Sequence, residues 1–339
     1  MKYLFIGDLH FGEQGNSQKF NGQILDFLRW VVETFSADVD GVVQVGDYFD
    51  SRNRIDVSTL NYGIMGSKIL QEGFGKENVY VLAGNHCSYY LNRLDVSSLA
   101  AIDAYVTVVD EMKSLGDNLL LTPWIATDEQ WDDLVSTHSK YEYIAGHFEF
   151  SAFNMNENYV MESGRSHREL NKAKTILSGH YHTRQEKDNV IYIGTPYPIT
   201  FSEANQAHGV YTLDTETGEI EFIQYDGIKV VSIPYTELDT LKDLDTTNTR
   251  VRIEFPSDIE DESIIGDILE EVGEMGFEGV RSLYKGKKLE KLLSNDVNIE
   301  DIENIDESVM DAIKNIDVTE INKDILTTIY KQAIEASNE

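Results

Sequence analysis

The sequence has little cysteine, no long apolar run and few basic residues. It contains one cysteine among 339 residues, which excludes an intrachain disulfide and fits a reducing compartment. No apolar stretch approaches the roughly 18 to 20 residues that a membrane-spanning helix needs. Only four apolar residues separate Lys2 from Gly7, too few for the apolar core of a signal peptide. We therefore expect a globular protein that stays in the cytoplasm.

The shortage of basic residues is uneven along the chain. Lys and Arg number 28 against 60 Asp and Glu, a formal net charge of -32 that should repel nucleic acid and membranes. From Asp258 onward there are 22 acidic and 8 basic residues, a net of -14 over 82 positions. The remaining 257 positions have 38 acidic and 20 basic residues, a net of -18. This asymmetry indicates a separate C-terminal module with its own partner.

Short apolar strands alternate with helical stretches from Lys2 to about Tyr225, a pattern typical of α/β layers. Apolar spacings of three and four predict helices at 24–35, 57–70 and 94–104. Residues 214–218 have the composition of a hairpin turn. The expected strands are 3–6, 41–45, 79–82, 106–109, 119–121, 143–145, 175–177, 190–193, 209–213 and 220–223.

The pattern changes after about residue 226. A strand at 250–255, a helix at 264–275 and a strand at 280–284 predict a small α+β unit over 227–285. Residues 286–297 are expected to be a linker. Residues 298–339 predict two amphipathic helices, which need a partner surface because they have no core of their own.

Five of the expected strands are followed by a glycine and then a polar residue. Ligands in α/β sheets bind beyond the carboxyl ends of the strands, so these polar residues are candidates for one site. The five pairs are Gly7-Asp8, Gly46-Asp47, Gly84-Asn85, Gly146-His147 and Gly179-His180.

These residue types suit a divalent metal. Asp8 and His10 are two positions apart, so on an extended chain both point to one face and hold one cation; His180 and His182 repeat the spacing. The mixed nitrogen and oxygen donors lack a thiolate and suit manganese, iron or zinc. A pair of such ions activates water and stabilises a phosphoryl displacement. His86, next to Asn85, is then a candidate general acid or transition-state donor.

The ordered motifs from Gly7 to His182 resemble the calcineurin-like metallophosphoesterase superfamily, and within it the SbcD-type nuclease subunits, above all those of large tailed phages. The resemblance implies a two-sheet α/β sandwich flanked by helices (1–226), a small α+β capping domain (227–285), and a C-terminal helical segment that binds an SMC-like coiled-coil ATPase. It implies a homodimer formed through helices near 57–70 and 94–104.

The same resemblance implies the activity and the ligands. The activity would be manganese-dependent cleavage of DNA, as 3'-5' exonuclease and single-strand endonuclease, in break repair and recombination in the host cytoplasm. His86 would be catalytic. One ion would be held by Asp8, His10, Asp47 and His182, and the other by Asp47, Asn85, His147 and His180.

One position departs from the family pattern. An acidic residue usually follows the catalytic histidine, but here the residue is Cys87, a poor substitute because a thiol is mostly neutral and hydrogen-bonds weakly. Asp50 or Asp95 is expected to support His86 instead, unless catalysis is weaker. Cys87 itself is a redox switch, a metal ligand or an inert packed thiol, and we favour the packed thiol.

Two local basic stretches are candidate DNA contacts. Residues 163–187 have a net charge of +4 in an otherwise acidic chain, and a second basic pair follows Asp47. Each is a phosphate-contacting track or a solvated face. The candidate residues are Arg52, Arg54, Arg165, Arg168, Lys172 and Arg184.

A DNA nuclease subunit is the leading functional hypothesis. The first rival is a phosphatase or phosphodiesterase acting on small molecules or phosphoproteins, because the same metal motifs serve many substrates. The second is a scaffold that has lost catalysis, with Cys87 as the mark of that loss.

Overall fold

The structure, a computed structural model, describes residues 1–90, 92–156, 159–256 and 262–285. The predicted linker at 286–297 and the predicted helical segment at 298–339 lie outside these ranges. Residues 1–253 and 264–281 belong to one compact unit, which contains all the elements that build the site.

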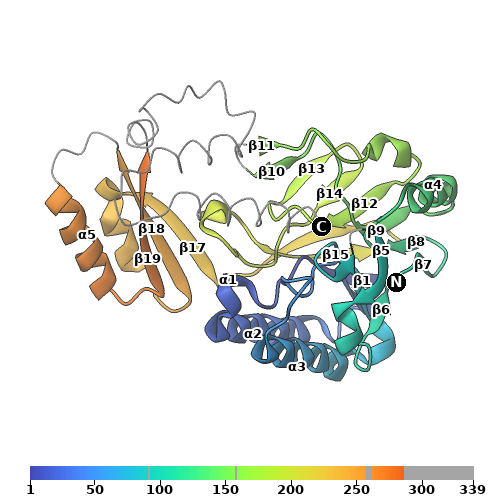
Figure 1. The fold of residues 1–339 in the computed structure, drawn as a ribbon, viewed down its shortest axis with the longest axis horizontal. Coiled ribbons are helices and arrows are strands. Elements are labelled where there is room, and N and C mark those ends of the chain that lie inside the picture. Colours follow the sequence, from blue (N-terminus) through green and yellow to red (C-terminus); the bar gives the residue numbers. More distant parts are fainter. Residues whose placement is uncertain (91, 157–158, 257–261, 286–339) are drawn as a thin grey trace, which may run out of the picture. The chain divides into compact units, whose positions relative to one another are not determined.

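The first of two six-stranded sheets has the order β16-β15-β1-β2-β3-β6 (Figure 1). Its strands β1, β2, β3 and β6 are parallel, and β15 pairs antiparallel with both β1 and β16. The bounds are β1 Lys2–Ile6, β2 Gly41–Gln44, β3 Val79–Leu82, β6 Thr107–Val109, β15 Gly209–Asp214 and β16 Ile220–Gln224.

The second sheet has the order β13-β14-β12-β9-β8-β7. Its four central strands are parallel, and the edge strands β7 and β13 are antiparallel to their neighbours. The bounds are β7 Lys113–Leu115, β8 Leu119–Thr122, β9 Tyr143–His147, β12 Thr175–Gly179, β13 Gln185–Lys187 and β14 Val190–Tyr192.

The two sheets pack face to face and helices cover their outer faces. In β1, Leu4 and Ile6 join the core under the helices α2 (Gln18–Phe35) and α3 (Val57–Phe74), whereas Phe5 joins the core between the sheets. Figure 1 shows α2 and α3 side by side against the first sheet. The helix α4 (Asp128–Thr137) covers the second sheet. The predicted α/β sandwich is confirmed, and its central strands are largely apolar because both faces are buried.

The remaining described elements are shorter or lie after residue 226. A short helix, α1, precedes α2, and two hairpins extend from the sandwich. After residue 226, three strands form a sheet in the order β17-β18-β19, with α5 between the last two in sequence. The bounds are α1 Glu13–Asn16, β4 Ser88–Tyr90, β5 Arg93–Ser97, β10 Asn154–Asn156, β11 Tyr159–Val160, β17 Lys229–Pro234, β18 Thr249–Pro256, α5 Glu262–Glu274 and β19 Gly279–Lys285. No helix of the described part of the chain is long and apolar enough to cross a membrane.

The prediction of a helix at 94–104 is wrong. Arg93–Ser97 is the strand β5, paired with β4, and only a single 3-10 turn follows it at Ser98–Ala101. The hydroxyl groups of Ser97 and Ser98 both donate to the carbonyl of Cys87. Serine side chains that hydrogen-bond the backbone in this way compete with helix formation. This competition explains why the apolar spacing predicted a helix that does not form.

The close approach of two glycines at the carboxyl ends of β1 and β14 gives a stability prediction. A Cβ on Gly7 would lie 1.8 Å from the carbonyl oxygen of Gly194, whereas a Cβ on Gly22, inside α2, would meet nothing within 4 Å. We expect Gly7→Ala to lower the free energy of unfolding by about 2 kcal/mol or more, because the backbone must move apart. Gly22→Ala should raise it by up to about 1 kcal/mol, because alanine favours helix. Urea unfolding followed by circular dichroism measures both; equal effects would contradict the close packing.

Candidate metal centre

The polar residues predicted to meet do so at the carboxyl ends of β1, β2, β3, β9 and β12. Donor atoms of Asp8, His10 and His182 lie within 4.8 Å of one another, and so do those of Asp47, His147 and His180. The side-chain oxygen of Asn85 lies 2.9 Å from Nε2 of His147 and 3.1 Å from Nδ1 of His180. The seven predicted ligands therefore form two donor groups, the first around His182 and the second around His147.

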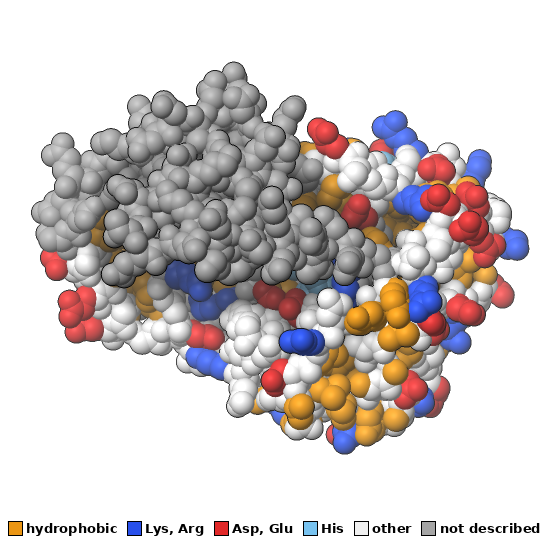
Figure 2. Space-filling view, in the orientation of Figure 1, with side chains coloured by type: hydrophobic (Ala, Val, Ile, Leu, Met, Phe, Trp, Pro, Cys, Tyr) orange, Lys and Arg blue, Asp and Glu red, His pale blue; other side chains and the backbone are white. Residues whose placement is uncertain are grey.

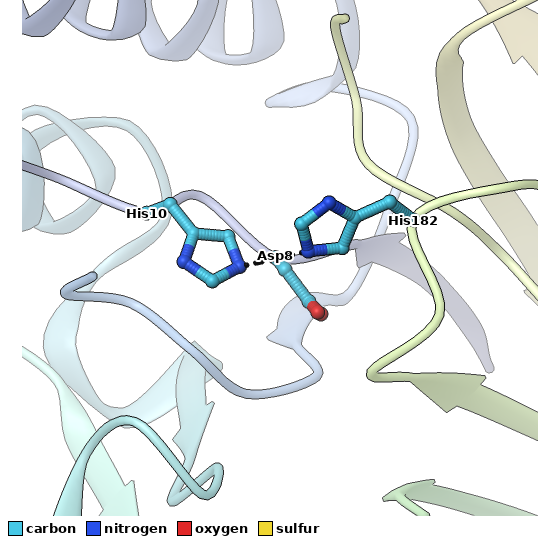
Figure 3. Close-up of side chains that lie close together, drawn as sticks. All are labelled: Asp8, His10 and His182. Carbon is cyan, nitrogen blue, oxygen red and sulfur yellow. Dashed lines mark hydrogen bonds between the residues drawn. The ribbon is translucent and has the colours of Figure 1, made fainter. Parts of the chain in front are cut away.

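In the first donor group, the atoms that would coordinate a cation are not used by hydrogen bonds to the rest of the protein. Figure 3 shows the imidazoles of His10 and His182 pointing toward each other, with their Nε2 atoms 3.1 Å apart. The Asp8 carboxylate is 1% exposed; its Oδ2 accepts a hydrogen bond from the His180 amide, whereas its Oδ1 has no hydrogen-bond partner. A buried, unpartnered carboxylate oxygen beside two facing imidazole nitrogens fits a divalent cation, which would satisfy all three atoms.

The second donor group surrounds Asp47. Oδ2 of Asp47 lies 3.2 Å from Nε2 of His147, while its Oδ1 accepts a hydrogen bond of 2.9 Å from the His86 amide. Both Asp47 and His147 are buried. Carboxylate, amide and imidazole atoms again form the mixed donor set of a borderline cation. That Asp47 bridges both positions stays a prediction.

Each imidazole of the two donor groups has an acceptor on its other ring nitrogen. His147 Nδ1 donates to the Val45 carbonyl at 2.9 Å, so Nε2 is the ring atom that faces Asp47 and Asn85 and would bind a cation. The other partners are carboxylates: Asp50 for His10 at 3.2 Å, Glu149 for His180 at 3.4 Å and Glu203 for His182 at 3.4 Å. Such partners fix the tautomer and the ring orientation of metal-binding histidines. Sequence reasoning missed Glu149 and Glu203 in this role.

Charges inside the site are strongly coupled. Burial alone raises the pKa of Asp47, but the His147 imidazole outweighs it and holds that pKa well below its usual range. Burial lowers the pKa of His182, yet Glu203 and Asp8 more than offset it and raise the pKa to about 9. Burial likewise lowers the pKa of His147, and Asp47 raises it to about 9. Protons on these rings balance the carboxylates, and a bound cation would take their place.

The backbone is strained at three of the predicted ligands. His10, Asp47 and His180 have φ angles of 50°, 50° and 87°. This left-handed region is uncommon for residues other than glycine and typically costs about 1 to 3 kcal/mol at each position. The prediction that Asp8 and His10 share a face of an extended strand is therefore wrong, because β1 ends at Ile6 and the chain turns at His10. The turn, rather than strand alternation, brings the two side chains together.

His86 is oriented by Asp50, although through its backbone. The Nδ1 atom of His86 hydrogen-bonds the carbonyl oxygen of Asp50, and His86 lines the same pocket as His10 and Asp47. A carbonyl oxygen only accepts, so Nδ1 keeps its proton and Nε2 is the atom available to a substrate. Asp95, the other predicted support, instead pairs with Arg93 at 3.0 Å on the surface.

Cys87 is a packed thiol. Its side chain is fully buried in the core shared with α2 and α3. Burial and, secondarily, the Asp47 carboxylate raise its pKa to about 12. It is therefore neutral at physiological pH and supplies no charge to His86.

The pocket at the metal centre is acidic. It has a volume of about 340 Å³, and its described lining includes Glu13, Asp50 and Glu203 but no lysine or arginine. Arg165 lines a neighbouring cavity of about 320 Å³ together with Trp124 and His147.

The other predicted DNA contacts lie elsewhere. Arg184 stacks on the Phe222 ring at 3.8 Å. Arg52 and Arg54 lie in the loop after Asp50, and Arg168 and Lys172 are exposed at and after a 3-10 turn, His167–Leu170. The structure does not bring these six residues together at the pocket.

Known proteins are similar to this chain in sequence. Residues 1–184 match the calcineurin-like phosphoesterase family. The chain is 28% identical to exonuclease subunit 1 of Enterobacteria phage T4 over 266 residues, which are 75% of this chain and 76% of that protein. Two solved structures also align, a novel archaeal phosphodiesterase (13% identity, TM-score 0.35, 66% of this chain and 100% of that one) and a hypothetical protein of Thermus thermophilus (16% identity, TM-score 0.39, 66% and 99%).

The buried position of Cys87 gives a reactivity prediction. The native thiol should not react with Ellman's reagent at pH 8 over the time in which the urea-unfolded protein reacts completely, because it is both inaccessible and protonated. A Ser136→Cys variant, which places a second thiol on an exposed position of α4, is the control and should release one equivalent rapidly. Fast reaction of the native wild-type thiol would instead support a redox role.

Proposed function

Because this chain belongs to the calcineurin-like phosphoesterase family, we propose that it is a metal-dependent DNA nuclease with 3'-5' exonuclease and single-strand endonuclease activity. The observation that carries the proposal is the meeting of two metal-binding donor groups and His86 at one pocket. The similarity to exonuclease subunit 1 of phage T4 supports DNA as the substrate. In this proposal the protein works in the cytoplasm of an infected host, in DNA break processing and recombination.

Two divalent ions, which we propose are manganese, fit the two donor groups. Asp8, His10 and His182 would hold one, and Asn85, His147 and His180 the other, with Asp47 between them. Such a pair lowers the pKa of a bound water and neutralises charge on a phosphodiester.

Residues of the protein then orient His86 and the imidazoles that would bind the metal ions. The Asp50 carbonyl fixes the tautomer of His86, so its Nε2 is placed to exchange a proton with the phosphodiester's leaving oxygen. The carboxylates of Asp50, Glu149 and Glu203 hold the imidazoles of the donor groups in place. The acidic lining leaves few groups to attract a polyanion, so a partner or the basic residues outside the pocket must supply affinity for DNA.

We propose an SMC-like coiled-coil ATPase as that partner. The amphipathic pattern at 298–339 indicates a partner surface, and the resemblance to SbcD-type subunits implies that this partner is the ATPase, with 227–285 as the capping domain and 286–297 as the linker. Arg165, beside Trp124 and His147, is the proposed DNA contact closest to the site; Arg52, Arg54, Arg168, Lys172 and Arg184 would act farther out.

A homodimer is supported by exposed apolar side chains. Val57 and Met65 of α3, and Tyr89 and Val96 of the β4–β5 hairpin, are all at least 40% exposed. Figure 2 shows hydrophobic side chains gathered on the visible face around α3. Contiguous exposed apolar patches mark protein–protein interaction sites, so α3 and the β4–β5 hairpin are the surfaces we propose for the dimer.

The central test is a cleavage assay with manganese on linear duplex and single-stranded DNA, beside a generic aryl phosphodiester. We expect cleavage of DNA by the wild type, loss with a chelator, and a reduction of about 100-fold or more for His86→Ala, since a positioned proton donor typically contributes that much. Asp95→Ala is the control and should match the wild type, because Asp95 pairs with Arg93 on the surface. Hydrolysis of the aryl ester alone would favour a small-molecule esterase, and no hydrolysis with intact ATPase binding would favour a scaffold.

The apolar stripe in the C-terminal segment gives a partner prediction. The stripe consists of Ile299, Ile302, Ile305, Val309, Ile313 and Ile316. Ile313→Asp should abolish co-purification with an ATPase partner of this kind, because it places a charge in the stripe proposed to dock. Asn315→Asp adds the same charge two residues away, off the stripe, and should leave binding within a few-fold of the wild type. Wild-type binding by Ile313→Asp would contradict the proposed docking surface.

A further inference from the structure

A buried network links the strand β18 to one of the two donor groups. Its centre is Glu203, which is 4% exposed although charged. Besides the His182 imidazole, its carboxylate accepts hydrogen bonds from the amide of Ile199 at 2.8 Å and from the hydroxyls of Thr195 at 3.2 Å and Thr200 at 3.0 Å. Glu203 therefore has no freedom to move without breaking several bonds.

The loop that carries this network is held from its other side by Arg250, near the start of β18. The guanidinium donates to the carbonyl of Pro198 at 2.8 Å and to that of Ile199 at 3.2 Å. It lies between the rings of Phe20 and Phe201, at 5.8 and 5.7 Å. Only 9% of Arg250 is exposed, and the burial of its charge is compensated by these two carbonyls and by the nearby carboxylates of Glu278 and Glu203.

Glu203 and Arg250 thus both hydrogen-bond the backbone of Ile199. Ile199 accepts from Arg250 through its carbonyl and donates to Glu203 through its amide. An unbroken series of hydrogen bonds runs from β18 through Ile199 and Glu203 to Nδ1 of His182, whose Nε2 faces His10. The second donor group has no such connection within the described residues, because the side chain of its carboxylate partner Glu149 is 33% exposed and pairs with His180 alone.

We propose that Glu203 and Arg250 are positioning residues that set the cation affinity of the donor group of Asp8, His10 and His182 and leave the other group unaffected. The proposal rests on the two-cation centre of the proposed function. Glu203 holds the His182 ring with its Nε2 lone pair toward the cation, and Arg250 holds the loop that carries Glu203. Any event that displaces Arg250 from the Pro198 and Ile199 carbonyls would therefore weaken one cation position selectively.

Manganese binding to the full-length protein, followed by the electron paramagnetic resonance signal of the free ion, tests the proposal without DNA. The wild type should bind two ions. Glu203→Gln and Arg250→Met should each weaken one of the two by about 10- to 100-fold, the range found when the partner of a metal-binding histidine is removed. Arg250→Lys, which keeps the positive charge and a single donor nitrogen, should lie between Arg250→Met and the wild type.

Matched variants identify the affected position. Glu149→Gln should weaken the other ion, so that combining it with Glu203→Gln weakens both. In a His182→Gln background, which removes a ligand of the first group, Glu203→Gln should cause no further loss of manganese affinity.

Two results would overturn the proposal. One is wild-type manganese affinity in both Arg250→Met and Glu203→Gln. The other is an equal weakening of both ions together with a lowered thermal midpoint. Two bound ions with no DNA cleavage would instead defeat the nuclease function and leave this proposal standing.

Discussion

Two carboxylates buried at the meeting edge of two sheets, Asp8 and Asp47, constrain the rest of the structure. Neither carboxylate is more than 2% exposed, and Oδ1 of Asp8 has no partner. Buried charge is tolerated only where compensating charge is close, and here five histidines and the strained turns at His10, Asp47 and His180 supply the compensation. A large sandwich core with apolar strands on both faces is what holds such strained, charged turns in place.

Much of this arrangement was predictable from the sequence because it depends on strand order and local motifs. Apolar strands followed by glycine and a polar residue place Asp8, Asp47 and Asn85 at one edge in any parallel sheet. The supporting groups were not predictable in the same way. Glu203 contacts His182 from 21 residues away, and Arg250 reaches Ile199 from 51 residues away, so nothing in local spacing marks them. The helix expected at 94–104 failed for a related reason, since pairing with β4 decided the structure there.

Cys87 stands where the family resemblance implies an acidic residue beside His86. The thiol is neutral and faces the core, so orientation of His86 falls to the carbonyl of Asp50, while the Asp50 carboxylate contacts His10. One residue therefore supports both a proposed ligand and the proposed catalytic imidazole. Because the pocket is acidic and the net charge is -32, the proposed DNA substrate would have to be attracted by the proposed cations and by the proposed partner.

The proposed function depends on two cations bound at two defined positions. Crystals grown with manganese and measured for anomalous scattering locate the ions without reference to activity. We predict two peaks, one coordinated by Asp8, His10 and His182 and one by Asp47, His147 and His180. Peaks at neither position, or a single ion held elsewhere in the pocket, would contradict the claim.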